Sequence, residues 1–310
     1  MARFQLALLG ATGMVGQKLV ELLDAFPEFE LAEVAASDAR VGQTCAGRPL
    51  LSARSIQSPY VISALPSSVA TELEPLLVQR GHTVFSNASA HRMRRDVPIL
   101  IPDVNPDHLR LVEEQTTPGK LITNSNCVVA AIAPPLSCLQ RLSPIRHISV
   151  VTLQAISGAG YPGVSAMDIQ ANVLPYIAGE ARKIQAETKK VLGDGKQDAG
   201  FSMMVHVHRV PVLHGHTAVL HVELEDAVSV QEISEALQME PEIYSCYEDP
   251  LAPQPRVHIG DRDTKIHIGG IEVHGRRVGL RVLTHNLVRG AAWAALSNAR
   301  FFVHAMEPVR

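Results

Sequence analysis

The chain has 310 residues, of which 46% are hydrophobic and 19% are charged, and its formal net charge is −3. This length is enough for two ordinary domains, each with a sizeable core. The near balance of charges gives no reason to expect a nucleic acid or an anionic membrane as a partner.

The cysteines and the N-terminus bear on the compartment. No two cysteines form a CxxC pair, so their spacing indicates neither a zinc knuckle nor a redox pair. The N-terminal stretch is too short and too rich in glycine for a signal peptide. No apolar run has the length of a membrane span, and we expect Pro134 and Pro135 to interrupt the run after Cys127. We therefore expect a cytoplasmic protein with reduced thiols at Cys45, Cys127, Cys138 and Cys246.

The first part of the chain alternates strands and helices. Short apolar runs predict strands, and apolar positions at helical spacing predict helices. This alternation is typical of an α/β fold with a doubly wound parallel sheet and helices on both faces, the Rossmann-type plan. In chain order we expect a strand over 4–10, a helix over 14–25, strands over 29–37 and 60–66, a helix over 69–81, and strands over 82–89 and 120–126.

The pattern changes to α+β after a helix that begins near Cys127. The strands expected there predict a mostly antiparallel sheet. A last segment, 286–306, has the pattern of a long amphipathic helix that packs back on the first domain. We expect a first domain over 1–127, completed by 286–310, and a second over 128–285. The elements of the second are a β-rich run over 146–158, helices over 180–193 and 229–238, and strands within 203–225 and 265–285.

A glycine turn, GATGMVG (10–16), lies between the first strand and the first helix. Gly10 permits a tight turn, Gly13 lets the backbone approach a pyrophosphate, and Gly16 allows close packing of helix on strand. The spacing is looser than GxGxxG, and a plain structural turn is the alternative, but the flanking strand and helix favour a dinucleotide site. The candidate contacts are Gly10, Thr12, Gly13, Met14 and Val15.

The choice of dinucleotide depends on the end of the second strand, AASDARVG (35–42). An acidic residue there usually binds the ribose hydroxyl of NAD, whereas an arginine suits the extra phosphate of NADP. Both Asp38 and Arg40 are present, and Ser37 can bond either form. We favour NADP, with Arg40 on the phosphate and Asp38 turned away.

Cys127 opens the apolar run of TNSNCVVAAIAPPL (123–136). A buried, inert thiol is one interpretation, since cysteine is among the most often buried residues. The other is a nucleophile: Asn126 or Ser125 is the expected N-cap, and a helix N-terminus lowers the pKa of a thiol in the first turn. A nucleophile also needs a base within reach.

The base has to be found among 14 histidines, and the densest stretch is HVHRVPVLHGHT (206–217). One interpretation is a zinc site made by two HxH pairs on neighbouring strands. Against a metal, the stretch holds no Cys, Asp or Glu, and Pro211 interrupts the strand register. The other interpretation is that one histidine is catalytic beside Arg209 and the rest are structural.

Eight segments, in the same order over most of the chain, resemble the aspartate-β-semialdehyde dehydrogenase family, and most of all its archaeal and fungal branch. Any one of them alone is a weak signal. The segments are GATGMVGQ (10–17), SNASAHRM (86–93), VPILIPDVNPDHL (97–109), TNSNCVVA (123–130), QAISGAGYPGV (154–164), the pair Glu180 and Lys183, RVPVLHGHT (209–217) and HNLVRGAA (285–292).

The resemblance implies a role for each matching position. Cys127 is the nucleophile, Gln154 orients the acyl group, and His216 is the acid/base that takes the thiol proton. Arg209 binds the substrate carboxylate and Glu180 its amino group. The remaining implied contacts are Arg92, Lys183 and Asn126 with phosphate, and Ser157, Gly158 and Asn286 with the cofactor, Asn286 at the nicotinamide.

The implied activity is the NADP-dependent, reversible conversion of L-aspartyl 4-phosphate to L-aspartate 4-semialdehyde through a Cys127 thioester. It belongs to the biosynthesis of lysine, threonine, methionine and isoleucine. The second domain is then the catalytic and dimerisation domain, and its sheet builds a homodimer or a tetramer. The alternatives are a related acyl reductase, such as malonyl-CoA reductase or N-acetyl-glutamyl-phosphate reductase, and a non-catalytic paralogue.

Overall fold

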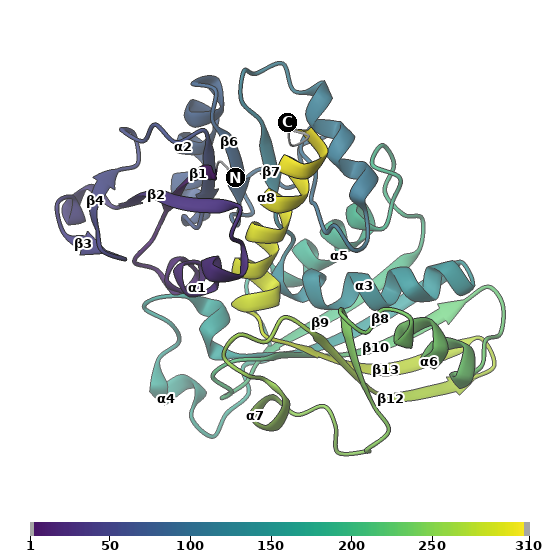
Figure 1. Cartoon of the computed structure of the whole chain (residues 1–310). Coiled ribbons are helices and arrows are strands. Elements are labelled where there is room, and N and C mark those ends of the chain that lie inside the picture. Colours follow the sequence, from purple (N-terminus) through teal and green to yellow (C-terminus); the bar gives the residue numbers. More distant parts are fainter. Residues whose placement is uncertain (1–2, 307–310) are drawn as a thin grey trace. The chain divides into compact units, whose positions relative to one another are not determined.

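The computed structural model describes residues 3–306, which form two compact units. The first unit holds the described residues up to Ser125 and those from Ala291 onward, and the second runs from Asn126 to Gly290 (Figure 1). Each unit is built around one sheet.

The sheet of the first unit has seven strands in the order β3-β4-β2-β1-β5-β6-β7. All neighbouring pairs are parallel except β3 with β4, which confirms the expected parallel sheet. The strands are β1 (Phe4–Leu9), β2 (Phe29–Ala36), β3 (Thr44–Cys45), β4 (Arg48–Ser52), β5 (Tyr60–Ser63), β6 (Thr83–Ser86) and β7 (Leu121–Thr123).

Helices cover both faces of this sheet, as the sequence predicts. On one face, α2 (Ser67–Gln79) packs Leu77 into a core cluster that includes Val84 of β6. On the other, α8 (Trp293–Met306) sets Phe302 edge-on to Phe85, the next residue of β6. Successive strand residues point to opposite faces, so α2 and α8 lie on opposite sides. Two shorter helices follow β1 and β6, namely α1 (Met14–Leu22) and a 3-10 helix over Pro106–Glu114.

The last helix departs from its predicted start. The segment begins as a π-helix over Val288–Ala292, and only then continues as α8. Gly290 sits in this wide turn, which is a form that often marks functional sites. Residues 307–310, the end of the segment expected to complete the first domain, lie outside the described residues.

The sheet of the second unit has six strands in the order β11-β12-β13-β10-β8-β9. The prediction of a mostly antiparallel sheet is confirmed, because the three central pairs are antiparallel and only the two outer pairs are parallel. The strands are β8 (Ile145–Gln154), β9 (Ser202–Arg209), β10 (His216–Leu224), β11 (Tyr244–Tyr247), β12 (Ile266–His274) and β13 (Arg277–Thr284).

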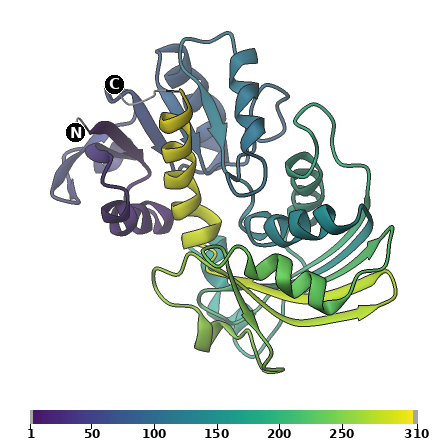
Figure 2. The same cartoon turned by 45° about the vertical axis from the view of Figure 1, so that its right-hand side comes forward.

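Three helices lie along one face of this sheet (Figures 1 and 2). On β8, Ile148 and Val150 point toward them and are fully buried, whereas Val151 and Leu153 on the other face are 36% and 38% exposed. The face without these helices is therefore partly apolar and accessible in the single chain. The three helices are α3 (Cys127–Leu142), α5 (Glu180–Val191) and α6 (Val230–Gln238); α4 (Ala166–Ile169) and α7 (Pro255–His258) are single turns.

The expectation that Pro134 and Pro135 interrupt the run after Cys127 is wrong, because α3 continues through both prolines to Leu142. Two prolines deprive the carbonyls of Ala130 and Ala131 of their helical partners. All residues from Val128 to Leu136 are buried, so tertiary packing outweighs this loss. Within residues 3–306, no helix combines the length and the apolar character that crossing a membrane requires.

Candidate active site

Cys127 is the first residue of α3, and the segment before it is held at three points. The Asn126 side chain caps the helix by accepting the N–H of Val128 at 2.8 Å. The same side chain donates to Glu180 at 2.8 Å, and the Asn126 backbone N–H donates to Glu187 at 2.6 Å. Glu180 and Glu187 are two turns apart on α5, so one face of that helix fixes the approach to Cys127.

Gly290 touches the same helix start. A Cβ on Gly290 would lie 2.8 Å from the Cys127 Cβ and 3.1 Å from its Cα, which is closer than real side chains allow. The π-helix thus brings bare backbone against the candidate nucleophile. Only glycine fits this approach without moving Cys127.

Gln154, Arg209 and His216 lie side by side at one end of the six-stranded sheet. Gln154 on β8 is paired with Arg209 on β9. On the other side of β8, Leu153 is paired with Thr217, which puts His216 of β10 beside Gln154. The Gln154 amide also reaches Glu180 at 3.4 Å. Segments distant in sequence thus meet where the parallel and antiparallel pairings of β8 place them.

Arg209 is buried and points back over the loop after β8, where it donates to the Ala155 carbonyl at 2.7 Å. Burial lowers the pKa of its guanidinium, and the negative charges of the Cys127 thiolate and Glu180 act in the opposite direction. Arg209 therefore shares an electrostatic environment with both. A buried, planar guanidinium of this kind suits a carboxylate ligand.

His216 is buried and its ring is fixed from one side. The Ala155 backbone N–H donates to His216 Nδ1 at 3.0 Å. Burial, together with the positive charges of Arg209 and His285, lowers the pKa of His216 to about 3. The imidazole is therefore neutral at physiological pH, with its proton on Nε2. No described residue accepts from the buried Nε2.

Gly158 packs closely against both of these side chains. A Cβ on Gly158 would fall 2.8 Å from an Arg209 guanidinium nitrogen and 2.9 Å from His216 Nε2. Next to it, the Ser157 hydroxyl accepts from the Asn286 amide at 2.9 Å and pairs with His214 at 3.1 Å. The predicted cofactor contacts Ser157, Gly158 and Asn286 are thus one connected group.

The zinc interpretation requires the two HxH pairs to lie on neighbouring strands, and they do not. His206 and His208 lie on β9 and His216 on β10, and β8 separates the two strands. In the described part of the chain, no three His, Cys, Asp or Glu side chains are placed to hold a metal ion.

The glycine turn of the first unit has the geometry that a dinucleotide loop requires. Gly10 has φ +75°, and a Cβ there would lie 2.5 Å from the Ala64 carbonyl oxygen. A Cβ on Gly16 would lie 2.2 Å from the Gly10 oxygen, so α1 packs against the turn itself. Gly13 is the N-cap of α1 and supplies no side-chain cap, and Met14 and Val15 open that helix. Backbone N–H groups at such a start suit a pyrophosphate.

The residues after β2 fit an NADP site better than an NAD site. Ser37 caps a short 3-10 helix over Asp38–Arg40. The Asp38 carboxylate accepts the Ser52 hydroxyl at 3.0 Å, so it is already engaged, and Arg40 is exposed. A free guanidinium beside an engaged carboxylate favours the extra phosphate.

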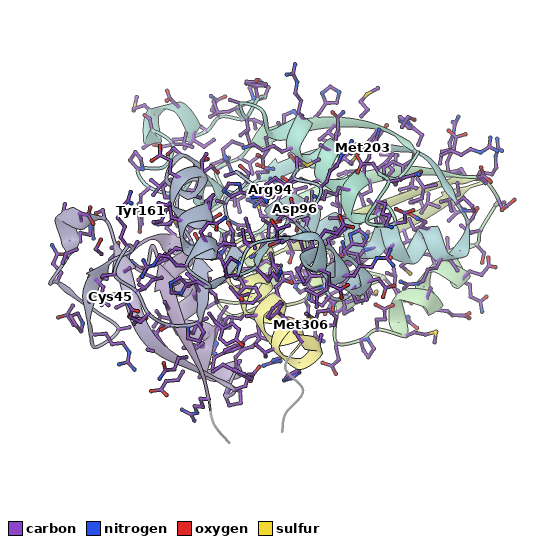
Figure 3. The ribbon with its side chains drawn as sticks, turned by 90° about the horizontal axis from the view of Figure 1, so that it is seen from above. Cys45, Arg94, Asp96, Tyr161, Met203 and Met306 are labelled. Atoms are coloured by element: carbon purple, nitrogen blue, oxygen red, sulfur yellow. The ribbon has the colours of Figure 1, made fainter. Side chains whose placement is uncertain are left out.

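The basic loop after β6 contains three arginines, of which Arg94 and Arg95 are exposed and Arg92 is buried. Arg94 pairs with Asp96 at 2.6 Å, and the two lie together in Figure 3. Arg92 is 7% exposed and donates to the Asn87 carbonyl at 2.7 Å. Lys183, by contrast, is an exposed residue of α5 in the second unit. Arg92 is therefore a buried cation fixed by a backbone carbonyl, whereas Arg94 and Arg95 of the same loop are exposed.

Three contacts at the site were not predicted from the sequence. They are Gly290 against Cys127, the Ala155 N–H on His216, and Glu187 with the Asn126 backbone N–H. Only Glu187 has a sequence feature from which a buried contact could have been predicted. It falls on the buried stripe of α5 with Ile184 and Val191, where an unpaired carboxylate would be costly.

Two family models match the chain. The NAD-binding domain of semialdehyde dehydrogenases matches residues 5–112, and the dimerisation domain of semialdehyde dehydrogenases matches residues 136–289. Together they cover most of both units.

Individual relatives match over their full length. The aspartate-semialdehyde dehydrogenase of Archaeoglobus fulgidus is 39% identical over 97% of this chain and 98% of its own. That of Schizosaccharomyces pombe is 34% identical over 98% and 99%. Among solved structures, aspartate-semialdehyde dehydrogenase with NADP from Candida albicans superposes with a TM-score of 0.87 at 30% identity, covering 98% of this chain and 99% of that one.

Proposed function

Because the chain belongs to the aspartate-semialdehyde dehydrogenase family, we propose that it is the NADP-dependent enzyme that interconverts L-aspartyl 4-phosphate and L-aspartate 4-semialdehyde. The observation that carries this proposal is the convergence at one helix start: Cys127 in the first turn of α3, with Arg209 and Glu180 acting on the same small space. A thiol nucleophile beside an amino-acid clamp is what this reaction needs.

Cys127 forms the covalent intermediate. In the oxidative direction its thiolate attacks the aldehyde carbon and gives a thiohemiacetal, which becomes a thioester when hydride is lost. Backbone N–H groups in the first turn of α3 stabilise the developing oxyanion, a contact worth about 3 kcal/mol per donor in other enzymes. The cofactor supplies the hydride acceptor. Phosphate then attacks the thioester and releases aspartyl phosphate, so one difficult step is divided into two easier ones.

The substrate is held by charge. Arg209 binds its α-carboxylate as a two-pronged donor, and Glu180 binds its α-amino group. Gln154 orients the acyl oxygen from the adjacent strand. Arg92, Lys183 and Asn126 bind the phosphate. Arg92 is supported in this role by its fixed backbone contact at Asn87.

The first unit binds NADP. The turn residues Gly10, Thr12, Gly13, Met14 and Val15 hold the pyrophosphate, supported by the close approach at Gly10. Ser37 and Arg40 hold the adenosine phosphate. Ser157, Gly158 and Asn286 of the second unit serve the nicotinamide end, supported by the hydrogen bond between Ser157 and Asn286.

The second unit is the catalytic and dimerisation domain of a homodimer, with a tetramer as the further assembly. The partly exposed, apolar face of its sheet around Val151 and Leu153 supports dimerisation there. Four free cysteines in the described residues support a cytoplasmic location. The activity serves the biosynthesis of lysine, threonine, methionine and isoleucine.

The test is phosphate-dependent NADP reduction with L-aspartate 4-semialdehyde, measured by the absorbance of NADPH. We expect turnover in the purified protein and none in Cys127→Ser, with unchanged thermal unfolding. Cys138→Ser, at a buried thiol of the same helix, is the matched control and should keep its turnover. Turnover with malonyl-CoA and NADPH, but none with aspartate semialdehyde, would show that the proposed substrate is wrong. Normal activity of Cys127→Ser would show that Cys127 is not the nucleophile.

A further inference from the structure

Asn124 is the buried centre of a hydrogen-bond network in the first unit. It follows β7 directly and is 1% exposed. Its amide nitrogen donates to Asn87 Oδ1 at 2.8 Å and to the Ala291 carbonyl at 3.0 Å. Its side-chain oxygen accepts from Asn298 of α8 at 2.8 Å. The network therefore joins the loop after β6, the segment after β7 and the C-terminal segment at one side chain.

Two backbone carbonyls decide which way the amides of this network point. A carbonyl such as that of Ala291 can only accept, so the Asn124 atom that faces it is the nitrogen. The Asn298 nitrogen that reaches Asn124 also donates to the Leu100 carbonyl at 3.1 Å. The oxygen of Asn124 is therefore the acceptor from Asn298. Both amide hydrogens of Asn124 are used within the protein, which leaves none for a ligand.

One arm of the network fixes the loop that carries Arg92. The Asn87 side chain accepts from Asn124 and donates to the Ser63 carbonyl at 3.2 Å. The Asn87 backbone carbonyl accepts from the Arg92 guanidinium at 2.7 Å. The Asn124 backbone N–H adds a bond to the Ser86 carbonyl at 2.8 Å. Asn87 is thus held by its side chain and holds Arg92 by its main chain, so a shift of Asn124 is passed on to the cation.

The other arm fixes the two stretches of chain that lead to Cys127. Asn124 lies three residues before Cys127, and Ala291 directly follows Gly290, whose backbone packs against Cys127. The hydrogen bond from Asn124 to Ala291 ties these two stretches together. Leucine has the same number of side-chain atoms but would leave each of the three buried partner groups without this contact, which is costly.

We propose that Asn124 is a positioning residue that holds both the phosphate-binding Arg92 and the nucleophile Cys127 in the places that the reaction requires. This rests on the proposed function, since it assigns the support of two groups that have roles there. Asn124 acts through Asn87 on one side and through Ala291 on the other. A misplacement of about 1 Å costs about 10²-fold in rate when reacting groups must be aligned, so loss of this network should be measurable.

The first experiment compares two neutral substitutions at neighbouring buried residues of the whole protein. Asn124→Leu removes the network, and Thr123→Val is the matched control, because its hydroxyl bonds to the Pro98 carbonyl outside the network. We expect Asn124→Leu to weaken the binding of inorganic phosphate and to slow Cys127 alkylation, each by at least about tenfold. Thr123→Val should change both by less than about twofold. Wild-type values for both in a folded Asn124→Leu protein, as judged by cooperative thermal unfolding, would overturn the proposal.

The second experiment breaks one arm at a half-buried residue, so it gives a result even if Asn124→Leu does not fold. Asn87→Ala should weaken phosphate binding, titrated by calorimetry, and leave the rate of Cys127 alkylation unchanged. In an Arg92→Ala background it should weaken phosphate binding no further, because it acts through that arginine. Additive losses, or slower alkylation in Asn87→Ala, would overturn the proposal.

Neither measurement requires turnover. If the protein showed these changes but did not act on aspartate semialdehyde, the proposed function would be wrong and the role of Asn124 would stand.

Discussion

Replacing Gly290 by alanine should displace the nucleophile without touching its chemistry. The new Cβ would lie 2.8 Å from the Cys127 Cβ. Carbon atoms in contact prefer about 3.5–4.0 Å, so the start of α3 must move by about 1 Å. No positive φ is involved at Gly290, so the effect is steric and not a matter of backbone preference.

Two magnitudes follow from this displacement. Overpacking of a buried contact costs about 1–3 kcal/mol, which lowers the Tm of a domain of this size by about 2–12 °C. A misplacement of about 1 Å costs about 10²-fold in rate when reacting groups must be aligned. We therefore expect kcat to fall by one to two orders of magnitude.

The assay combines turnover with aspartate semialdehyde, the rate of Cys127 alkylation and thermal unfolding. Gly279→Ala is the matched control, because the nearest atom to its new Cβ is 3.9 Å away in the same unit. We expect Gly279→Ala to keep kcat within about twofold. If Gly290→Ala kept the wild-type kcat and alkylation rate, close packing at Gly290 would not be what positions Cys127.

Three further predictions concern charge. Arg209→Lys should raise the KM for aspartate semialdehyde by at least about tenfold with a smaller change in kcat, because an ammonium cannot reproduce the planar fork; an unchanged KM removes Arg209 from the substrate site. Arg40→Ala should raise the KM for NADP and leave the KM for NAD unchanged, and equal effects on both cofactors would contradict the assignment. Burial raises the pKa of Glu74 from its usual 4.5, against its hydroxyl contacts and the charge of Arg92. A raised folded-state pKa means that stability is full below pH 4.5 and falls as the pH rises through the folded value. Urea unfolding should therefore show Glu74→Gln gaining stability relative to wild type from pH 4.5 to pH 8, and a constant difference would refute this.

Most of the fold follows from local pattern. Alternation of short apolar runs with helical periodicity is enough to predict the parallel sheet of the first unit, and longer β-rich runs predict the antiparallel sheet of the second. The elements without a prediction are short, and they include β3 and β4, β11, α4, α7 and the 3-10 helix over Pro106–Glu114. A strand of two to five residues gives too little periodicity to detect. The prolines of α3 misled in the opposite way, because burial outweighed a local preference.

The chemistry-bearing side chains can also be read from the sequence, since a thiol after Asn-Ser-Asn or a glycine turn after a strand identifies itself. What holds these groups cannot. The Ala155 N–H that sets the His216 tautomer, and the Glu187 carboxylate that fixes Asn126, each lie 61 residues from their partners. One of the two is a backbone N–H, a group that every residue except proline possesses. Such contacts depend on strand register and helix packing, which only the tertiary structure decides.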